Sequence, residues 1–252
     1  MPRKNNAHDM TGSKSINVLL FDLDGTLYDQ GCGYEQEVHN NIFKFMAESS
    51  GGKFDEISSL EDAKRVWKPI FDKYNLTKRG LLGEGYVFDS VYYDKYIRQG
   101  APKYIRKDPE LRHFLESLKG YRKVIFTNAP ESSANEILDL LGVADLFEAV
   151  LGTEFLENKV CKPERAAFDK VLRYLDVNPD AVCYFEDSFK NLKAGKELGF
   201  TTVFVTSKTL TNEGRSEVEL SQFDAVVKTK VGMNLKEQLP NLWEQHSLIK
   251  LQ

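Results

Sequence analysis

Short apolar runs alternate with helical patterns along the chain, and this alternation constrains the fold more than any other feature of the sequence. The runs are residues 18–21, 123–126, 147–151, 181–185, 201–205 and 224–227. Short buried runs separated by helices are typical of βαβ units. In such units a helix crosses over between two strands, usually with a right-handed connection, and the strands form one parallel sheet. We therefore expect an α/β fold with a doubly wound parallel sheet.

Residues 30–100 interrupt this alternation between the first strand and the second. Apolar residues such as Val38 and Ile42 recur there at helical spacing, and no convincing strand pattern occurs. The spacing predicts a helical cap inserted after the first strand; an Ω-type loop or a separately functioning domain is the alternative. We expect the core domain to comprise residues 16–29 and 101–252, and the cap domain residues 30–100.

Length and charge narrow the classes of function. With 252 residues the chain can form one large domain or a core that carries an insert. It has 34 Lys and Arg against 38 Asp and Glu, which gives a formal net charge of -4. This balance argues against binding a nucleic acid polymer through charge, although one lysine can still bind a small phosphate ester. No apolar run is long enough to cross a membrane, so we expect no membrane partner.

The N-terminal segment and the cysteines indicate the compartment. Residues 1–15 are polar and of mixed charge, without the apolar stretch of a secretory signal, and we expect a disordered leader there. Cys32, Cys161 and Cys183 are widely spaced and odd in number, which matches neither a disulfide framework nor a paired metal motif. These features predict a reducing compartment, the cytoplasm or also the nucleus.

Two aspartates, Asp22 and Asp24, directly follow the first strand. Ligands of open α/β sheets bind beyond the carboxyl ends of the strands, so both carboxylates are expected where chemistry occurs. Two acids this close together cost stability unless a cation or another partner neutralises them. A solvated turn is the ordinary alternative, because a single Asp-x-Asp pattern is too short to be specific.

A threonine and a lysine occur later at comparable places. Thr127-Asn128 ends the second strand, where a hydroxyl and backbone N–H groups can bind phosphoryl oxygens; capping the next helix is the ordinary role of such a threonine. Lys162 precedes Pro163, at which the pattern predicts the start of a helix. A solvated lysine beside that proline is the simpler interpretation of this pair alone.

Two adjacent acids, Glu186 and Asp187, follow the strand at 181–185. They suit a hard, oxygen-seeking cation such as Mg²⁺, and equally an N-terminal cap for the next helix. Each of these four patterns is weak alone. Their order and their places, three of them at strand ends, make the combination specific.

In this order the segments DLDGTLY (22–28), FTNA (126–129), CKPE (161–164) and FEDS (185–188) resemble the haloacid dehalogenase-like superfamily. The resemblance covers residues from about 17 to 205 and includes the helical insert, which is similar to a type I cap of that superfamily. It implies a Rossmann-like core under this cap.

The resemblance also implies a role for each matching residue. Asp22 is the nucleophile that forms an aspartyl-phosphate, and Asp24 protonates the leaving alcohol and then activates water. Thr127 and the Asn128 backbone hold the phosphoryl oxygens, while Lys162 neutralises charge on Asp22 and the phosphate. The dehalogenase branch otherwise similar to this chain lacks an acid at the second position, so the chain looks like a phosphotransferase.

The cofactor that the resemblance implies is Mg²⁺. Its expected ligands are the side chains of Asp22 and Asp187 and the backbone oxygen of Asp24, with Glu186 as a supporting acid. The ion draws the carboxylate and the phosphate together and screens their repulsion.

A narrower resemblance is to the pyrimidine 5′-nucleotidase branch found in fungi and plants. It rests on FTNA and CKPE and on the segments 40–46, 140–147 and 239–243. The chain departs from that branch at Gly25, where Asn or Asp is usual, and at Glu186, where Asp is frequent. The resemblance implies hydrolysis of a nucleoside 5′-monophosphate by a monomer or homodimer. A sugar-phosphate or other metabolite phosphatase, a phosphomutase and a non-catalytic binding protein are the alternatives.

Aromatic residues and two histidines of the chain have less specific interpretations. The cap aromatics considered for base stacking are Tyr34, Phe88, Tyr92, Tyr93 and Tyr96. They can stack on a base, but packing the interior of the cap is the commoner role of such residues. His39 and His113 lack metal-binding partners at ligand spacing, so we expect them to fill the surface or the core.

Overall fold

The structure is a computed structural model that describes residues 15–206 and 217–244. Six strands form one sheet in the order β3-β2-β1-β4-β5-β6, and every neighbouring pair is parallel. The strands are β1 (Val18–Phe21), β2 (Arg122–Phe126), β3 (Ala149–Leu151), β4 (Val182–Glu186), β5 (Thr201–Thr206) and β6 (Ala225–Lys228). The doubly wound parallel sheet expected from the sequence is confirmed.

Helices cover both faces of this sheet because its central strand is apolar on both sides. Leu19 and Phe21 of β1 enter one apolar cluster, while Val18 and Leu20 enter another. The first cluster includes residues of α6 (Pro109–Ser117), α7 (Glu131–Leu141), the 3₁₀ turn Met233–Glu237 and α11 (Asn241–Glu244), and the second includes residues of α8 (Arg165–Leu175) and α9 (Phe189–Leu198). The carboxyl edge of the sheet is left for the functional residues.

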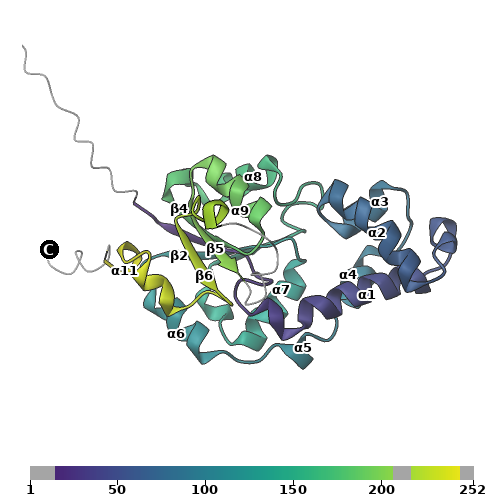
Figure 1. Ribbon diagram of the computed structural model, residues 1–252, viewed down its shortest axis with the longest axis horizontal. Coiled ribbons are helices and arrows are strands. Elements are labelled where there is room, and N and C mark those ends of the chain that lie inside the picture. Colours follow the sequence, from purple (N-terminus) through teal and green to yellow (C-terminus); the bar gives the residue numbers. More distant parts are fainter. Residues whose placement is uncertain (1–14, 207–216, 245–252) are drawn as a thin grey trace, which may run out of the picture.

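Helices form the regular structure between β1 and β2. They are α1 (Tyr34–Glu48), α2 (Leu60–Tyr74), α3 (Thr77–Gly83), α4 (Ser90–Arg98) and α5 (Ala101–Tyr104), with 3₁₀ turns at Gln30–Cys32 and Gly52–Glu56, followed by α6 on the sheet. Figure 1 shows α1 to α4 projecting as a bundle beyond the sheet. The helical cap expected after the first strand is therefore confirmed, while its limits at residues 30 and 100 stay a prediction.

Aromatic side chains form much of the interior of the cap. The Phe45 ring centre lies 4.9 Å from that of Tyr93 and 5.5 Å from that of Phe88, both edge-on. Tyr34 is also buried, at the base of the cap, whereas Tyr92 is mainly exposed. These contacts support the packing role expected of most cap aromatics, because edge-to-face rings add stability beyond their burial.

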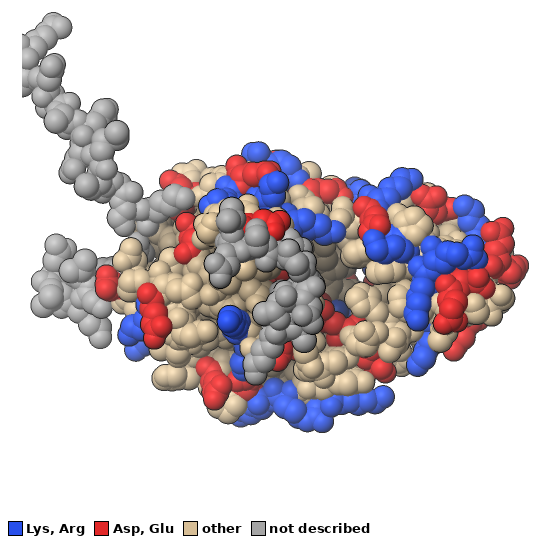
Figure 2. Space-filling model, in the orientation of Figure 1, with Lys and Arg blue, Asp and Glu red and all other residues tan. Residues whose placement is uncertain are grey.

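The outer surface carries both signs of charge. On the face shown in Figure 2, acidic and basic side chains are interspersed over the cap and over the core. None of the helices in residues 15–206 and 217–244 is long and apolar enough to cross a membrane. The expected leader, residues 1–15, lies outside the described residues except for Ser15.

Candidate active site

The motif residues meet at the carboxyl edge of the sheet. Asp22 follows β1, and its N–H donates to the Phe185 oxygen of β4 at 2.8 Å. Thr127 follows β2, and its N–H donates to the Leu151 oxygen of β3 at 3.0 Å. Because these parallel strands all end at the same edge, residues far apart in the sequence come together there.

Lys162 is the buried cation of this edge. Its ammonium group lies 2.7 Å from Asp22 Oδ1, 2.7 Å from Glu186 Oε2 and 2.8 Å from the Phe126 oxygen. Burial opposes a positive charge here, but the two carboxylates prevail and raise the pKa of Lys162 above its ordinary value. The solvated lysine considered for the sequence pair alone is therefore wrong, since the side chain is 1% exposed.

The Lys162 backbone is held by Asn128. The Asn128 side-chain oxygen accepts from the Lys162 N–H at 2.9 Å, and its Nδ2 donates to the Lys162 oxygen at 3.1 Å. A turn follows, in which the Glu164 N–H donates to the Cys161 oxygen at 2.8 Å. The prediction that a helix begins at Pro163 is wrong, because this turn delays the start of α8 to Arg165.

Three carboxylates crowd beside Lys162. Asp22, Glu186 and Asp187 each have an oxygen within 4.8 Å of the others. Burial and the negative charge of Glu186 raise the pKa of Asp22 to about 8, despite the opposing charge of Lys162. Burial, with Glu186 and Asp22, also raises the pKa of Asp187 well above its usual range. Carboxylates that repel one another in this way fit a divalent cation such as Mg²⁺, which prefers oxygen ligands.

Glu186 occupies a supporting position in the cluster. Its Oε2 accepts from Lys162 and from the Tyr184 hydroxyl, and its Oε1 accepts from the Ser188 N–H at 3.0 Å. Asp22 and Asp187 are thus the side chains better placed to face a metal ion. Both were expected as ligands, and the third expected contact, the Asp24 backbone oxygen, stays a prediction.

Gly25 packs against this cluster, where the pyrimidine nucleotidase branch usually has Asn or Asp. Its φ of +71° is in the left-handed region, and a Cβ there would lie 2.5 Å from Asp187 Oδ2 and 3.0 Å from Glu35 Oε1. A side chain at this position requires both carboxylates to move. The departure from the branch therefore has a local structural basis in this chain.

Asp24 points away from the cluster, toward the cap. Its Oδ2 lies 2.9 Å from Arg98 Nη1, its Oδ1 lies 2.9 Å from Arg98 Nη2, and the Tyr28 hydroxyl donates to Oδ1 at 2.5 Å. Burial favours the neutral acid, but the Arg98 guanidinium and the Tyr28 hydroxyl together lower the pKa of Asp24 below its usual value. The expected proton-transfer residue is therefore held as a carboxylate in this arrangement.

Arg98 is the principal site residue that the sequence analysis missed. It is the last residue of α4, and the Tyr34 hydroxyl fixes its position by donating to the Arg98 oxygen at 2.6 Å. The Asn41 side chain donates to the neighbouring Ile97 oxygen at 3.3 Å. No short motif contains Arg98, which lies 74 positions after Asp24. Its only sequence signal is an arginine at the end of a helix rich in aromatic residues.

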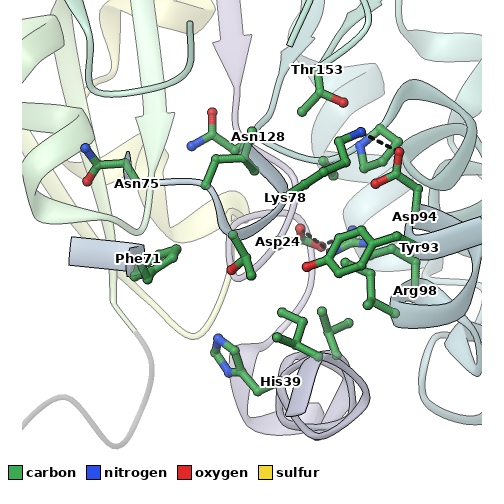
Figure 3. A pocket seen from close by; sticks show the side chains of 17 residues that line it. Asp24, His39, Phe71, Asn75, Lys78, Tyr93, Asp94, Arg98, Asn128 and Thr153 are labelled. Atoms are coloured by element: carbon green, nitrogen blue, oxygen red, sulfur yellow. Dashed lines mark hydrogen bonds and ion pairs between the residues drawn. The ribbon is translucent and has the colours of Figure 1, made fainter. Parts of the chain in front are cut away.

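A pocket of about 210 Å³ lies beside Asp24, between the cap and the edge of the sheet. Asn128, Pro130 and Thr153 line it from the core, and residues 75–78 together with α1, α2 and α4 line it from the cap. Figure 3 shows the polar side chains of the cap pointing into this space. The pocket is thus placed to receive the group attached to a phosphate held at Asp22.

Two further ionisable groups of the cap form a pair in this pocket. Lys78 Nζ lies 2.5 Å from Asp94 Oδ2, and both side chains are largely buried (Figure 3). His39 of α1, expected only as filler, lines the same pocket. Burial lowers the pKa of His39, so its imidazole is uncharged near neutral pH.

Thr127 directly precedes the core residues that line the pocket, and the loop after β3 adds Thr153 to the lining. The Thr127 Oγ1 accepts from the Ala129 N–H at 3.0 Å, which leaves its hydroxyl proton free to be donated to another group. Glu131 accepts from the Gly152 and Glu154 N–H groups, at 2.9 Å each, and so holds Thr153 against the pocket. The phosphate-binding roles expected of Thr127 and Asn128 stay predictions.

A sequence profile of the haloacid dehalogenase-like hydrolase family matches residues 16–199. This range begins before β1 and ends after α9, so it includes the four motif segments and the helical cap. The match therefore covers both the residues of the sheet edge and those of the pocket.

Individual known proteins are also similar to this chain. "Phosphate metabolism protein 8" of Saccharomyces cerevisiae is 25% identical over 195 residues, which are 72% of this chain but only 59% of the yeast protein. The phosphoglycolate phosphatase of Psychrobacter arcticus is 30% identical over 192 residues, covering 74% of this chain and 81% of that enzyme. The structure of a HAD phosphatase from Thermococcus onnurineus aligns with a TM-score of 0.57 at 19% identity, over 93% of this chain and 98% of that one. At this identity the structural likeness concerns the fold.

Proposed function

This chain belongs to the haloacid dehalogenase-like hydrolase family, and on that premise we propose that it is a Mg²⁺-dependent phosphatase. It hydrolyses a small phosphate monoester through an aspartyl-phosphate on Asp22. The observation that carries the proposal is the position of Asp22, 2.7 Å from the Lys162 ammonium group and inside the carboxylate cluster. The phosphatase name of the Psychrobacter relative supports the same reaction class.

The first half-reaction transfers the phosphoryl group to the protein. An Asp22 oxygen attacks phosphorus while the bond between phosphorus and the alcohol oxygen breaks. Lys162 neutralises the negative charge where carboxylate and phosphate meet, and Thr127 and the Asn128 N–H hold phosphoryl oxygens. Bound by Asp22, Asp187 and the Asp24 backbone oxygen, Mg²⁺ supplies the charge that screens the two anions from each other.

Asp24 donates a proton in the first half-reaction and accepts one in the second. The leaving alcohol takes a proton from its carboxyl group, and its carboxylate then takes a proton from the water that attacks phosphorus and frees Asp22. The products are the alcohol and inorganic phosphate. Because Arg98 and Tyr28 hold Asp24 as a carboxylate, the arrangement described here suits the water-activating step, and proton donation requires the Arg98 ion pair to weaken.

As substrate we propose a nucleoside 5′-monophosphate, preferably of a pyrimidine. The resemblance to the nucleotidase branch supports this choice, and the half-buried Phe71 adds aromatic surface to the pocket for a planar base. A sugar phosphate is the second candidate, because Thr77, Asn75 and Asn128 offer polar groups suited to hydroxyls. We propose the cytoplasm or the nucleus as the compartment.

A phosphate-release screen with purified protein and Mg²⁺ tests this proposal. The panel contains pyrimidine and purine nucleoside monophosphates, sugar phosphates and 2-phosphoglycolate. We expect the highest kcat/KM for CMP or UMP, and release that stops when EDTA removes the metal; a flat or sugar-favouring profile selects the second candidate. Asp22→Asn should lose phosphate release from every ester, whereas the exposed Asp180→Asn should retain it. Full activity in Asp22→Asn contradicts the proposed nucleophile.

A further inference from the structure

The charged side chains of the pocket beside Asp24 are paired with one another. Among the described residues that line it, the acids are Asp24 and Asp94 and the bases are Arg98 and Lys78. Arg98 contacts both oxygens of Asp24 at 2.9 Å, and Lys78 lies 2.5 Å from Asp94. His39 adds no charge near neutral pH, because burial lowers its pKa. This lining is therefore electrically balanced.

Among the described residues of this lining, every cation is already paired with an acid, so none is free to bind an anionic leaving group. To be neutralised here, a carboxylate or a second phosphate of the leaving group has to replace Asp94 as the partner of Lys78, or Asp24 as the partner of Arg98. Either exchange leaves a largely buried carboxylate without its partner, which is strongly unfavourable. The pocket therefore penalises a negative charge on the leaving group.

Lys190 is the nearby cation that needs separate consideration. It lies outside the pocket lining, on an exposed part of α9, with its ammonium group 5.2 Å from the centre of the Phe71 ring. The same group donates to the Asn75 side-chain oxygen. Lys190 thus lies behind two residues that line the pocket and does not face the group bound inside.

Two polar atoms of residues that line the pocket, in contrast, have no hydrogen-bond partner among the described residues. Arg98 Nε and Thr153 Oγ1 are buried without a hydrogen-bond partner, and both residues line the pocket. Buried donors without partners cost stability, so a ligand oxygen that bonds to them is favoured. Val38, Ile42 and Ile97 supply apolar surface around these atoms. This combination matches the hydroxyls and carbon framework of a neutral alcohol.

We infer that the pocket selects phosphate esters of uncharged, hydroxyl-bearing alcohols and discriminates against alcohols that carry a carboxylate or a second phosphate. The inference rests on the proposed phosphatase function and adds the charge of the leaving group to it. The alcohols that the pocket should accept include nucleosides and sugars. Glycolate, the alcohol of 2-phosphoglycolate, is excluded because it carries a carboxylate. Lys78 and Asp94 are the specificity-determining pair. Asp94 neutralises Lys78, which is the cation of the lining that is not paired with Asp24.

Two matched pairs of esters isolate the charge of the leaving group. 2-Hydroxyethyl phosphate and 2-phosphoglycolate differ in a CH₂OH group against a carboxylate, and glucitol 6-phosphate is paired with 6-phosphogluconate in the same way. The measurements are kcat/KM for hydrolysis and the inhibition constant against p-nitrophenyl phosphate, with the full chain and Mg²⁺. We expect both to favour the neutral member of each pair by at least about tenfold. A ratio near one, or in favour of the anion, overturns the inference.

Variants of the ion pair test the cause of this selectivity. Asp94→Asn leaves Lys78 as an uncompensated cation and should move the ratio toward the anionic esters by about fivefold or more, whereas Lys78→Met should move it the opposite way. Asp72→Asn, which removes the acid of an exposed cap pair with Lys68, should leave the ratio unchanged. Shifts in the same direction for both pocket variants contradict the assignment to Lys78 and Asp94.

Failure of the inference differs visibly from failure of the proposed function. If p-nitrophenyl phosphate and every other ester remain intact, the phosphatase proposal itself is wrong. If esters are hydrolysed with an anionic preference, the phosphatase stands and the neutral-alcohol inference falls. Wild-type ratios decide this point even when a pocket variant does not fold.

Discussion

The carboxyl edge of the sheet and the pocket under the cap are both buried and charged, yet they balance their charges differently. At the edge, the carboxylates of Asp22, Glu186 and Asp187 cluster together and only Lys162 opposes them, between Asp22 and Glu186; the pKa of Asp22 rises to about 8, mainly through burial and the charge of Glu186. In the pocket, each described acid has its own base. Uncompensated buried charge favours a ligand of opposite sign, whereas balanced charge favours a neutral one. The comparison thus predicts a divalent cation at the edge and an uncharged alcohol in the pocket.

Asp24 and Arg98 connect the two regions. Asp24 lies two residues after Asp22 on the core, and Arg98 ends the last long helix of the cap. Their two-point contact joins the cap to the residue for which we propose proton transfer.

The largest effect should follow from removing the cation at the edge. Lys162→Met leaves Asp22 and Glu186 facing each other without a positive charge, and an incoming phosphate adds to this excess. We expect kcat for p-nitrophenyl phosphate to fall about a hundredfold to a thousandfold in steady-state assays. The control Lys159→Met removes an exposed lysine three positions earlier and should behave as wild type. If Lys162→Met retains more than about a tenth of the wild-type kcat, the site does not depend on Lys162 to neutralise its negative charge.

A smaller effect should follow from separating the two regions at Arg98. Arg98→Met removes both contacts to Asp24 while the Tyr28 hydrogen bond remains, so the carboxylate is less well oriented. We expect kcat to fall about tenfold to a hundredfold, with a change in KM below about threefold.

Two further variants show whether geometry or charge alone is responsible. Arg98→Lys keeps the charge without the two-point contact and should have an intermediate kcat. Arg65→Met, an exposed arginine of α2, should change neither constant. An unaltered kcat in Arg98→Met, or a loss carried entirely by KM, shows that Arg98 does not position Asp24.

The smallest effect should come from crowding the acidic cluster at Gly25. Gly25→Ala places a Cβ 2.5 Å from Asp187 Oδ2 and displaces that carboxylate. We expect the Mg²⁺ concentration for half-maximal activity to rise about tenfold, as for other changes beside metal ligands. Gly51→Ala is the matched control, because Gly51 also has a positive φ but no atom within 4 Å of a Cβ. Equal Mg²⁺ requirements in the two variants contradict an effect of the Gly25 contact on Asp187.

The edge could be predicted from the sequence because its residues are marked by their position along the chain. An apolar run ends before Asp22, and other runs end before Thr127 and at Glu186, and the parallel arrangement brings these ends together. The local error at Pro163 has a tertiary cause. Asn128, from another strand end, bonds to both backbone groups of Lys162 and stabilises a turn where the sequence pattern predicts a helix.

The pocket could not be predicted in the same way. Its ion pairs join Asp24 to Arg98 and Lys78 to Asp94 across separations of 74 and 16 positions, and no short motif contains either base. In the sequence His39 is an ordinary histidine of a helix, and only the structure shows that it lines the pocket. Which charges neutralise one another depends on distances through space, and these distances depend on how the cap is seated.

The sequence by itself determined the parallel sheet, the helical cap and the acids and lysine of the catalytic edge, because strand periodicity and short motifs are local properties of the chain. Only the tertiary structure decided the partners of those charges: Lys162 between two carboxylates, Asp24 held by Arg98, and Lys78 neutralised by Asp94. The physical reason is that the energy of a buried charge depends on its neighbours and its exposure to water, which arise only when distant segments pack together.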